Sequence, residues 1–254
     1  MNGFYAFTKK EFSEQLHSYK ALILTAVLFL FGMMSPLLAK MLPDIIGTMN
    51  IEGMTLTIPE PTALDAYGQF FKNVGQLGFV ALLLIFSGLL SQDVTKGTLV
   101  VLLAKGLSRP AVIFSKFASA LVIWTVGYAL AAATAYGYTV YLFGNGVLPN
   151  LVYSLFCLWF FGVFILALLM CASTLTSGSY GGLLLTTGTL IVLLVLGYFP
   201  AMGEWNPVTL ASTNMALING TAAPSAMAVP VCVSLGYIAA LLATSVLVFR
   251  KKKL

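Results

Sequence analysis

The chain has 254 residues, of which 59% are hydrophobic and only 8% are charged, and its formal net charge is +5. An ordinary soluble domain carries about 25% charged residues. The composition therefore excludes a typical soluble protein and predicts an all-α integral membrane protein. Its three cysteines all fall in apolar stretches, so no disulfide framework is expected.

Ionisable residues divide the chain into uncharged runs of 19, 20, 87 and 45 residues. A helix needs about 20 apolar residues to cross the hydrocarbon core of a bilayer. The first two runs therefore hold one span each, and the third has room for three. The fourth run begins with many Ser, Thr, Asn and Pro residues, so only its second part is assigned a span. Six transmembrane helices are predicted.

The N-terminal segment 4–20 is predicted to form a helix that precedes the first span. Its spacing suits a helix lying in the cytoplasmic membrane interface, although a solvated tail is the alternative. The aromatic and aliphatic residues on one helical stripe are Tyr5, Phe12, Leu16 and Tyr19. The following span, 21–39, has no evident signal-peptide cleavage site and is interpreted as a retained helix.

An outer loop, 40–72, separates the first span from the second span at 73–92. Within this loop Thr62 and Asp65 stand at capping-box spacing, which predicts a helix that starts there and continues into the second span.

The cytoplasmic loop 93–116 contains an apolar hexapeptide, Leu99 to Ala104, that is too short to cross a bilayer. Thr98 can cap a helix over these residues and Gly106 can end it. A solvated loop would leave this helix exposed on every face, so something must cover it. Either it packs on its own bundle or dips into the headgroups, or it docks into a cytoplasmic partner.

Three further spans are predicted at 117–143, 150–176 and 181–200, with turn-forming residues between them. The third span repeats small residues at fourfold spacing, Gly127, Ala131 and Ala135, which favours close helix packing in lipid. An outer re-entrant loop, 201–226, then leads into the last span, 227–249.

Basic residues collect in the short cytoplasmic loops of membrane proteins. In the six-span map, eleven of the thirteen Lys and Arg residues fall in segments assigned to the cytoplasm, and both termini lie there. This topology accounts for the positive charge, so no nucleic-acid partner is expected.

The predicted spans contain no ionisable group that could bind a coupling ion. The single histidine, His17, lies in the interfacial segment, and no Gly-Lys-Ser/Thr triplet is available for a phosphate-binding loop. No metal site and no catalytic residue are predicted, so an enzyme is not expected. If ATP drives the protein, another chain must hold it.

Four segments together resemble the membrane subunits of ABC exporters of the type-2 permease class, and the resemblance runs through essentially the whole chain. They are KKEFSEQLHSYKALIL with FGMMSPLLAKMLPDII, PTALDAYGQFFKNVGQLG, KGTLVVLLAKGLSRPAVIFSKF and WNPVTLASTNMALING. The resemblance implies an elbow helix over 4–20 and a coupling helix between spans two and three. It also implies two permease subunits, identical or paralogous, in a bacterial cell membrane, joined to two ATP-binding subunits that hold ATP and Mg²⁺.

The resemblance further implies that residues Gly97 to Arg109 insert into the ATPase. The apolar anchors would be Leu99, Leu102 and Leu103, the charged rim would be Lys96, Lys105 and Arg109, and Thr98 would start the helix. Family members often carry an acidic residue shortly before the Gly-Thr pair. Here Lys96 stands directly before it, with Asp93 further upstream.

The expected function is export of an amphipathic or hydrophobic cargo such as a peptide, an antibiotic or a lipid. A stand-alone channel or carrier and a non-transporting membrane scaffold are the alternatives. Hydroxyl groups are the polar candidates for the translocation path, although each could instead bond to the preceding helical turn. They are Ser87, Thr134, Thr186 and Thr187.

Overall fold

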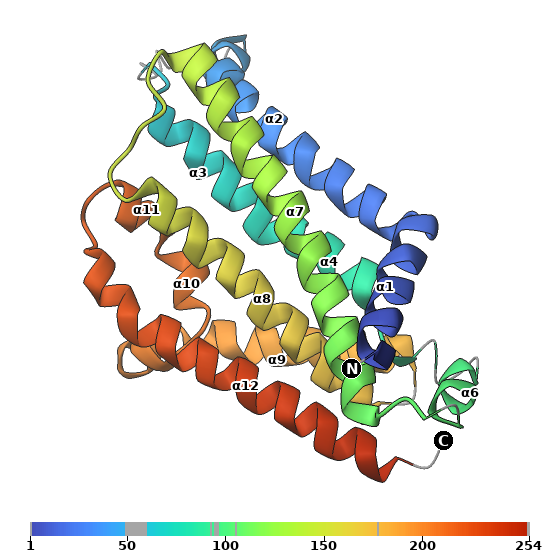
Figure 1. Ribbon diagram of the computed structural model, residues 1–254. Helices are drawn as coiled ribbons and strands as arrows, with labels where there is room; N and C mark the ends of the chain where they lie inside the picture. Colours follow the sequence, from blue (N-terminus) through green and yellow to red (C-terminus); the bar gives the residue numbers. More distant parts are fainter. Residues whose placement is uncertain are drawn as a thin grey trace.

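The computed structural model describes residues 2–48, 60–91, 93, 97–104, 106–176 and 178–252. Every regular element in these ranges is a helix, which confirms the all-α class (Figure 1). In chain order they are α1 (Asn2–His17), α2 (Lys20–Thr48), α3 (Ala63–Asn73), the π-helical η1 (Val74–Gly78), α4 (Phe79–Phe86), α6 (Thr98–Ala104), α7 (Arg109–Phe143), α8 (Leu151–Leu175), α9 (Ser179–Leu196), η2 (Pro200–Trp205), α10 (Thr209–Ser212), α11 (Asn214–Ile218), η3 (Pro224–Met227) and α12 (Ala228–Lys251).

Five helical segments in the described part of the chain are long and apolar enough to cross a membrane: Lys20–Pro43, Ala63–Phe86, Arg109–Phe143, Leu151–Leu175 and Pro224–Lys251. The protein is therefore a multi-pass membrane protein. The apolar part of α9, Tyr180–Leu196, is shorter. At 1.5 Å per residue it extends about 26 Å, slightly less than a hydrocarbon core of about 30 Å. Length alone thus supports five spans, one fewer than expected.

The helix of the second span starts at Ala63, ten residues before the expected span at 73. The Asp65 carboxylate accepts hydrogen bonds from the Thr62 backbone N–H and hydroxyl, both at 2.8 Å, as the capping spacing predicted. From there α3, η1 and α4 run on without interruption to Phe86. Most of the described part of the expected outer loop is therefore helical, since α2 also continues to Thr48. Residues 49–59 of that loop lie outside the described residues.

Helix α8 is the buried axis of the bundle, and α7 packs on it and on α2. The predicted small-residue face of α7, Gly127 with Ala131 and Ala135, is buried. Its neighbour in α2 is Gly32, where a side chain would overlap the Ala131 carbonyl. Small residues thus let these two backbones approach closely, as expected for helices packed in lipid.

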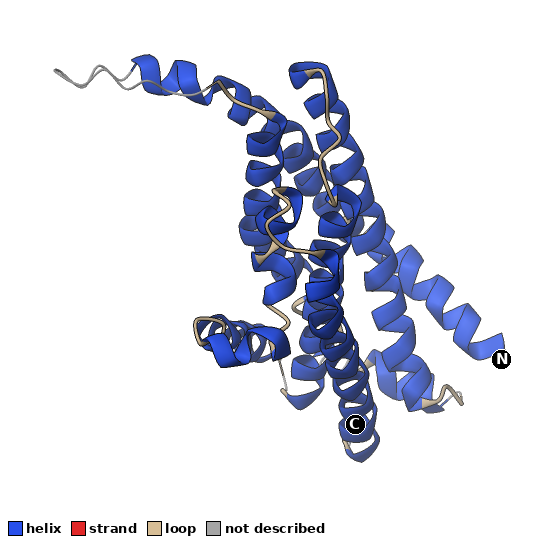
Figure 2. Cartoon of the chain, turned by 90° about the vertical axis from the view of Figure 1, so that its left-hand side faces the viewer, coloured by secondary structure: helices blue, strands red, loops and turns tan. Residues whose placement is uncertain are grey.

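The helix ends sort into two groups. Figure 1 shows α1, α6 and the last turn of α12 together at one end of the bundle, while the C-terminal ends of α2 and α7 lie at the other. Figure 2, turned by 90°, shows the described residues as helices and the loops between them. Helix α9 runs at an angle to α8 (Figure 1). Beyond it α10 and α11 fold back onto α8, where the Ser154 hydroxyl donates to the Asn214 carbonyl oxygen at 3.1 Å. This segment corresponds to the expected re-entrant loop.

Candidate functional site

The expected coupling helix is the seven-residue α6, which sits between two glycines in the left-handed region. Gly97 has φ of 68° and Gly106 has φ of 89°, and glycine adopts such angles without a steric penalty. The Gly106 N–H donates to the Leu103 carbonyl at 3.0 Å, which ends the helix. The Thr98 hydroxyl lies 3.2 Å from the Asp93 carbonyl oxygen and 3.3 Å from its Oδ1. Thr98 therefore fastens the start of α6 to Asp93.

Part of α6 is covered by its own chain. Leu99 is fully buried in the hydrophobic core, and Leu103 and Leu107 are half-buried against it. In this structure Leu99 has no free surface to offer a partner, which differs from its expected role as an anchor. Thr98, Ala104 and Ser108 are exposed. Leu102 lies within α6, whereas Lys96 and Lys105 lie outside the described residues.

Arg109, expected as a rim charge, instead binds the end of the last helix. Its Nη1 donates to the carbonyls of Phe249 and Arg250, both at 2.7 Å, and of Lys252 at 2.9 Å. The last four carbonyls of a helix lack partners within it, and a cation near them is favourable. Lys252 Nζ in turn donates to the carbonyls of Thr174 at 3.1 Å and Thr176 at 2.9 Å. The C-terminal segment is thereby tied between α7 and α8.

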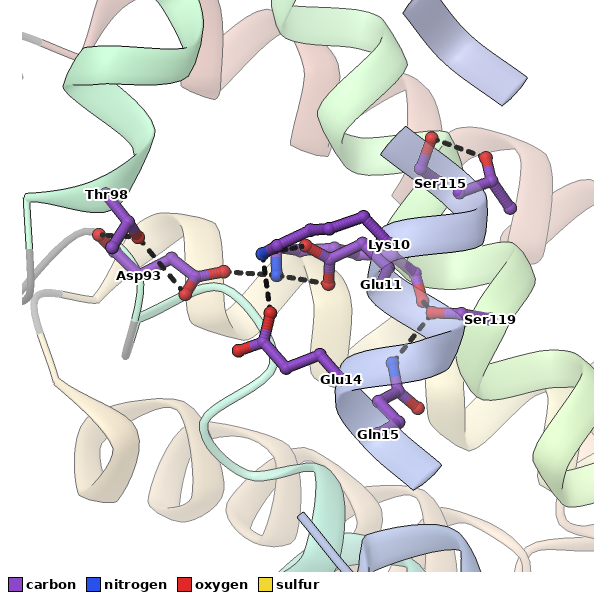
Figure 3. Close-up of polar contacts among 10 residues, drawn as sticks. Lys10, Glu11, Glu14, Gln15, Asp93, Thr98, Ser115 and Ser119 are labelled. Carbon is purple, nitrogen blue, oxygen red and sulfur yellow. Dashed lines mark hydrogen bonds and ion pairs between the residues drawn. The ribbon is translucent and has the colours of Figure 1, made fainter. Parts of the chain in front are cut away.

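A buried ion network lies next to α6, and sequence reasoning did not find it. Lys116, near the start of α7, pairs with Glu11 of α1 at 2.8 Å and also with Asp93. The side chains of Lys116 and Glu11 are each 4% exposed, and that of Asp93 is 13% exposed. Figure 3 shows Glu11 on α1 reaching toward the side on which Asp93 and Thr98 lie. In the sequence, Lys116 ends the predicted cytoplasmic loop 93–116, and Asp93 directly follows the second predicted span.

The network belongs to a polar seam between α1 and α7. Thr8 donates to the Ser115 hydroxyl at 2.9 Å, and Gln15 donates to the Ser119 hydroxyl at 2.7 Å. Their numbers rise together along both helices, so α1 runs parallel to the first turns of α7. Each segment carries polar residues, but nothing in the local sequence paired one segment with the other.

A second, more exposed ion pair lies on α1. Lys10 pairs with Glu14, four residues on, and its Nζ lies 3.4 Å from Glu11. Burial acts to lower the pKa of Lys10. The hydrogen bonds and charges of Glu14 and Glu11 outweigh this effect, so the pKa lies above its ordinary value. The charges of Lys10 and Lys116 thus both act on Glu11.

Helix α7 is longer than one membrane crossing requires. With 35 residues it extends about 52 Å, well beyond a hydrocarbon core of about 30 Å. Lys116 lies about 40 Å from the Phe143 end. A span that begins near Phe143 therefore leaves Lys116 at or beyond the opposite membrane surface, where charged groups are tolerated.

A groove of about 480 Å³ opens on the other side of the bundle, between the α3–η1–α4 helix, α8, α9 and the α10–α11 segment. Most of its lining is apolar. The π-helical turn contributes Gly75 and Gln76, and π-turns within helices are frequent at functional sites. The other polar side chains that line it are Lys72, Thr187, Ser212 and Asn214.

The four hydroxyl residues expected on a translocation path are not brought together. Only Thr187 lines the groove. The other three donate to the helical turn before them: Ser87 to Leu84, Thr134 to Leu130 and Thr186 to Gly182. Thr134 also lines a separate cavity beside α7. These bonds follow the alternative that the sequence left open.

The fold defines a multi-pass helical membrane protein. Residues 5–254 match the family model described as ABC-2 family transporter protein. The chain therefore belongs to the ABC-2 family of transporter proteins, and the resemblance drawn from sequence is confirmed. Comparison with curated proteins gives no match. Membership implies, in general, an ABC ATP-binding partner.

Proposed function

We propose that this chain is the membrane subunit of an ATP-driven ABC exporter in a bacterial cell membrane. Separate ATP-binding subunits hold ATP and Mg²⁺, and a second permease subunit, identical or paralogous, completes the transporter. The chain itself contributes no catalytic step. The observation that carries the proposal is α6, a short helix at the bundle end shared by both termini, in a chain of this family.

We propose that α9 is the sixth crossing. Five crossings would leave the two chain ends on opposite sides of the membrane. Arg109 binds carbonyls of the C-terminal segment, and Thr8 of α1 bonds to Ser115 only six residues further along α7. Both ends of the chain therefore gather at one end of the bundle, which supports an even number of crossings. The excess of Lys and Arg at that end supports a cytoplasmic position for it.

The proposed ATPase contact comprises the part of 97–109 that the bundle leaves open. Thr98 and Ala104 are exposed there and Leu103 is half-buried. The proposed contact also includes Gly97, Leu102 and the charged side chains of Lys96 and Lys105. Leu99 and Arg109 support the contact indirectly, because one anchors α6 to the core and the other binds α12.

We propose that the groove beside α9 forms this chain's half of the translocation path. Its apolar lining and few polar groups suit a mostly apolar cargo, such as an amphipathic peptide, an antibiotic or a lipid. Large apolar side chains of α9 are exposed, among them Leu184, Ile191 and Val192. A second permease subunit would cover them and close the path.

The test is Leu102→Asp, with the tagged chain purified from native membranes and attached proteins identified. We expect the wild-type chain to retain an ATP-binding subunit and the variant to lose at least about 90% of it, because a carboxylate is costly in an apolar contact. Membrane insertion should be unchanged. Ser13→Asp adds the same charge at exposed Ser13 of α1 and is the matched control.

Three outcomes would contradict the proposal. Equal ATPase recovery with Leu102→Asp would remove α6 as the contact. Cargo movement by the purified chain alone in liposomes would identify a stand-alone carrier, and partner binding without any cargo movement would identify a scaffold.

A further inference from the structure

The buried ion network joins three parts of the molecule that are far apart in sequence. Glu11 belongs to α1, Asp93 precedes α6, and Lys116 belongs to the first turns of α7. Thr98 extends the network to the first residue of α6 through its two contacts with Asp93. One ammonium group thus lies between the elbow, the coupling segment and the third span.

The two sides of the network differ in burial. The Glu11–Lys116 pair is almost completely covered, with 4% of each side chain exposed. Asp93 is more open, and its contacts with Thr98 are exposed. A covered pair is screened less by water and salt than an open one. The Glu11–Lys116 contact between α1 and α7 is therefore the stronger one, and the Asp93 contacts that hold α6 break more readily.

We propose that Glu11, Asp93 and Lys116 act as a mechanical joint that holds α6 to the α1–α7 pair. Lys116 is a positioning residue. When α6 moves, Lys116 transmits the movement to the first turns of α7, and α1 moves with them. The role in transport rests on the proposed function, whereas the joint itself is a property of this chain alone.

Stability by itself does not explain this arrangement. A buried ion network can often be replaced by neutral residues of similar size with little loss of stability, whereas removal of one partner leaves an uncompensated charge. A network of this kind is informative because its charges require one register between their helices. A fully neutral variant therefore separates the positioning role from folding.

The first experiment uses the purified full chain in nanodiscs, without any partner. The variant combines Glu11→Gln, Asp93→Asn and Lys116→Met, and amide hydrogen exchange of residues 98–104 is measured. We expect exchange to accelerate at least about tenfold, because α6 then opens independently, with the protein still folded. Glu14→Gln, which removes the exposed partner of Lys10 on the same helix and leaves the network intact, should change exchange less than about twofold.

Unchanged exchange of residues 98–104 in the neutral variant would overturn the joint. If that variant does not fold, Asp93→Asn alone leaves the Glu11–Lys116 pair balanced. It should accelerate exchange in α6 by about threefold and leave α1 unaltered. No acceleration in this single variant would equally overturn the proposal.

The second experiment tests transmission in the complex with the ATP-binding subunit. ADP with vanadate should alter exchange at residues 109–119 of the wild-type chain, and this change should fall by more than about half in the neutral variant, although the complex still forms. A full response in that variant would refute transmission through Lys116. If the wild-type chain carries no ATPase, the proposed function fails, and the first experiment still decides whether the joint exists.

Discussion

Helix α7 makes two contacts of opposite character. Near its middle, Trp124 packs on Gly162 of α8, where an added Cβ would overlap the indole ring. At its start, Lys116 is held by Glu11 and Asp93. The first contact depends on shape and the second on charge. Lipid gives helices no hydrophobic reason to associate, so close packing decides there, whereas charges act at the membrane surface.

The polar contact should be the more sensitive of the two. Lys116→Met removes the cation that pairs with both Glu11 and Asp93. The expected loss is about 3–5 kcal/mol in the free energy of unfolding, because the Glu11 carboxylate stays buried without its closer partner. Equilibrium unfolding in mixed micelles measures it. Lys116→Arg keeps the charge and should recover most of the loss. Equal losses in both variants would contradict a charge-based contact.

The packing contact should be less sensitive to substitution. The sign of the change in the free energy of unfolding should depend on which glycine is replaced. Gly162→Ala places a methyl group against Trp124, which cannot move easily because its Nε1 donates to the Trp159 carbonyl at 3.1 Å. We expect a loss of about 1–3 kcal/mol. At Gly137 of the same bundle a Cβ would meet nothing within 4 Å. Gly137→Ala should therefore be neutral or stabilise the helix by up to about 1 kcal/mol, and a similar loss at both sites would argue against packing.

The smallest effect is expected at the end of α12. Arg109→Gln weakens the bonds to three carbonyls of the C-terminal segment. A charge near a helix C-terminus contributes up to about 2 kcal/mol when partly buried. We expect a loss of about 1–2 kcal/mol in the same unfolding measurement. Lys251→Gln, at an exposed side chain, is the control and should change little. If Lys251→Gln lowered the free energy of unfolding and Arg109→Gln did not, Arg109 would not stabilise the end of α12.

Local patterns predicted much of the bundle. Apolar runs of sufficient length identified five membrane helices, and a sixth predicted span corresponds to the shorter α9. Gly144 to Pro149 separates α7 from α8, as turn chemistry suggested. The capping spacing of Thr62 and Asp65 marks the start of α3. The buried small-residue face of α7 also followed from its period. Each of these properties depends on residues within one or two helical turns.

The candidate site was less predictable from the sequence. The apolar character of 99–104 showed that α6 must be covered, but not that Leu99 would be buried in its own core. Likewise, Lys116 and Arg109 read as cytoplasmic charges, and one is buried between carboxylates while the other binds helix carbonyls. Thr187 could not be separated from Thr134 and Thr186, because the groove exists only where α3, α8 and α9 meet.

The sequence by itself determined that this protein lies in a lipid bilayer, that it is helical and to which family it belongs. The length of the hydrophobic runs and the local motifs carry that information. Only the tertiary structure decided which helix became the buried axis and which charges meet. Residues 11, 93 and 116 are separated by long stretches of chain. Their pairing arises when α1 and α7 pack side by side, and no local pattern encodes that packing.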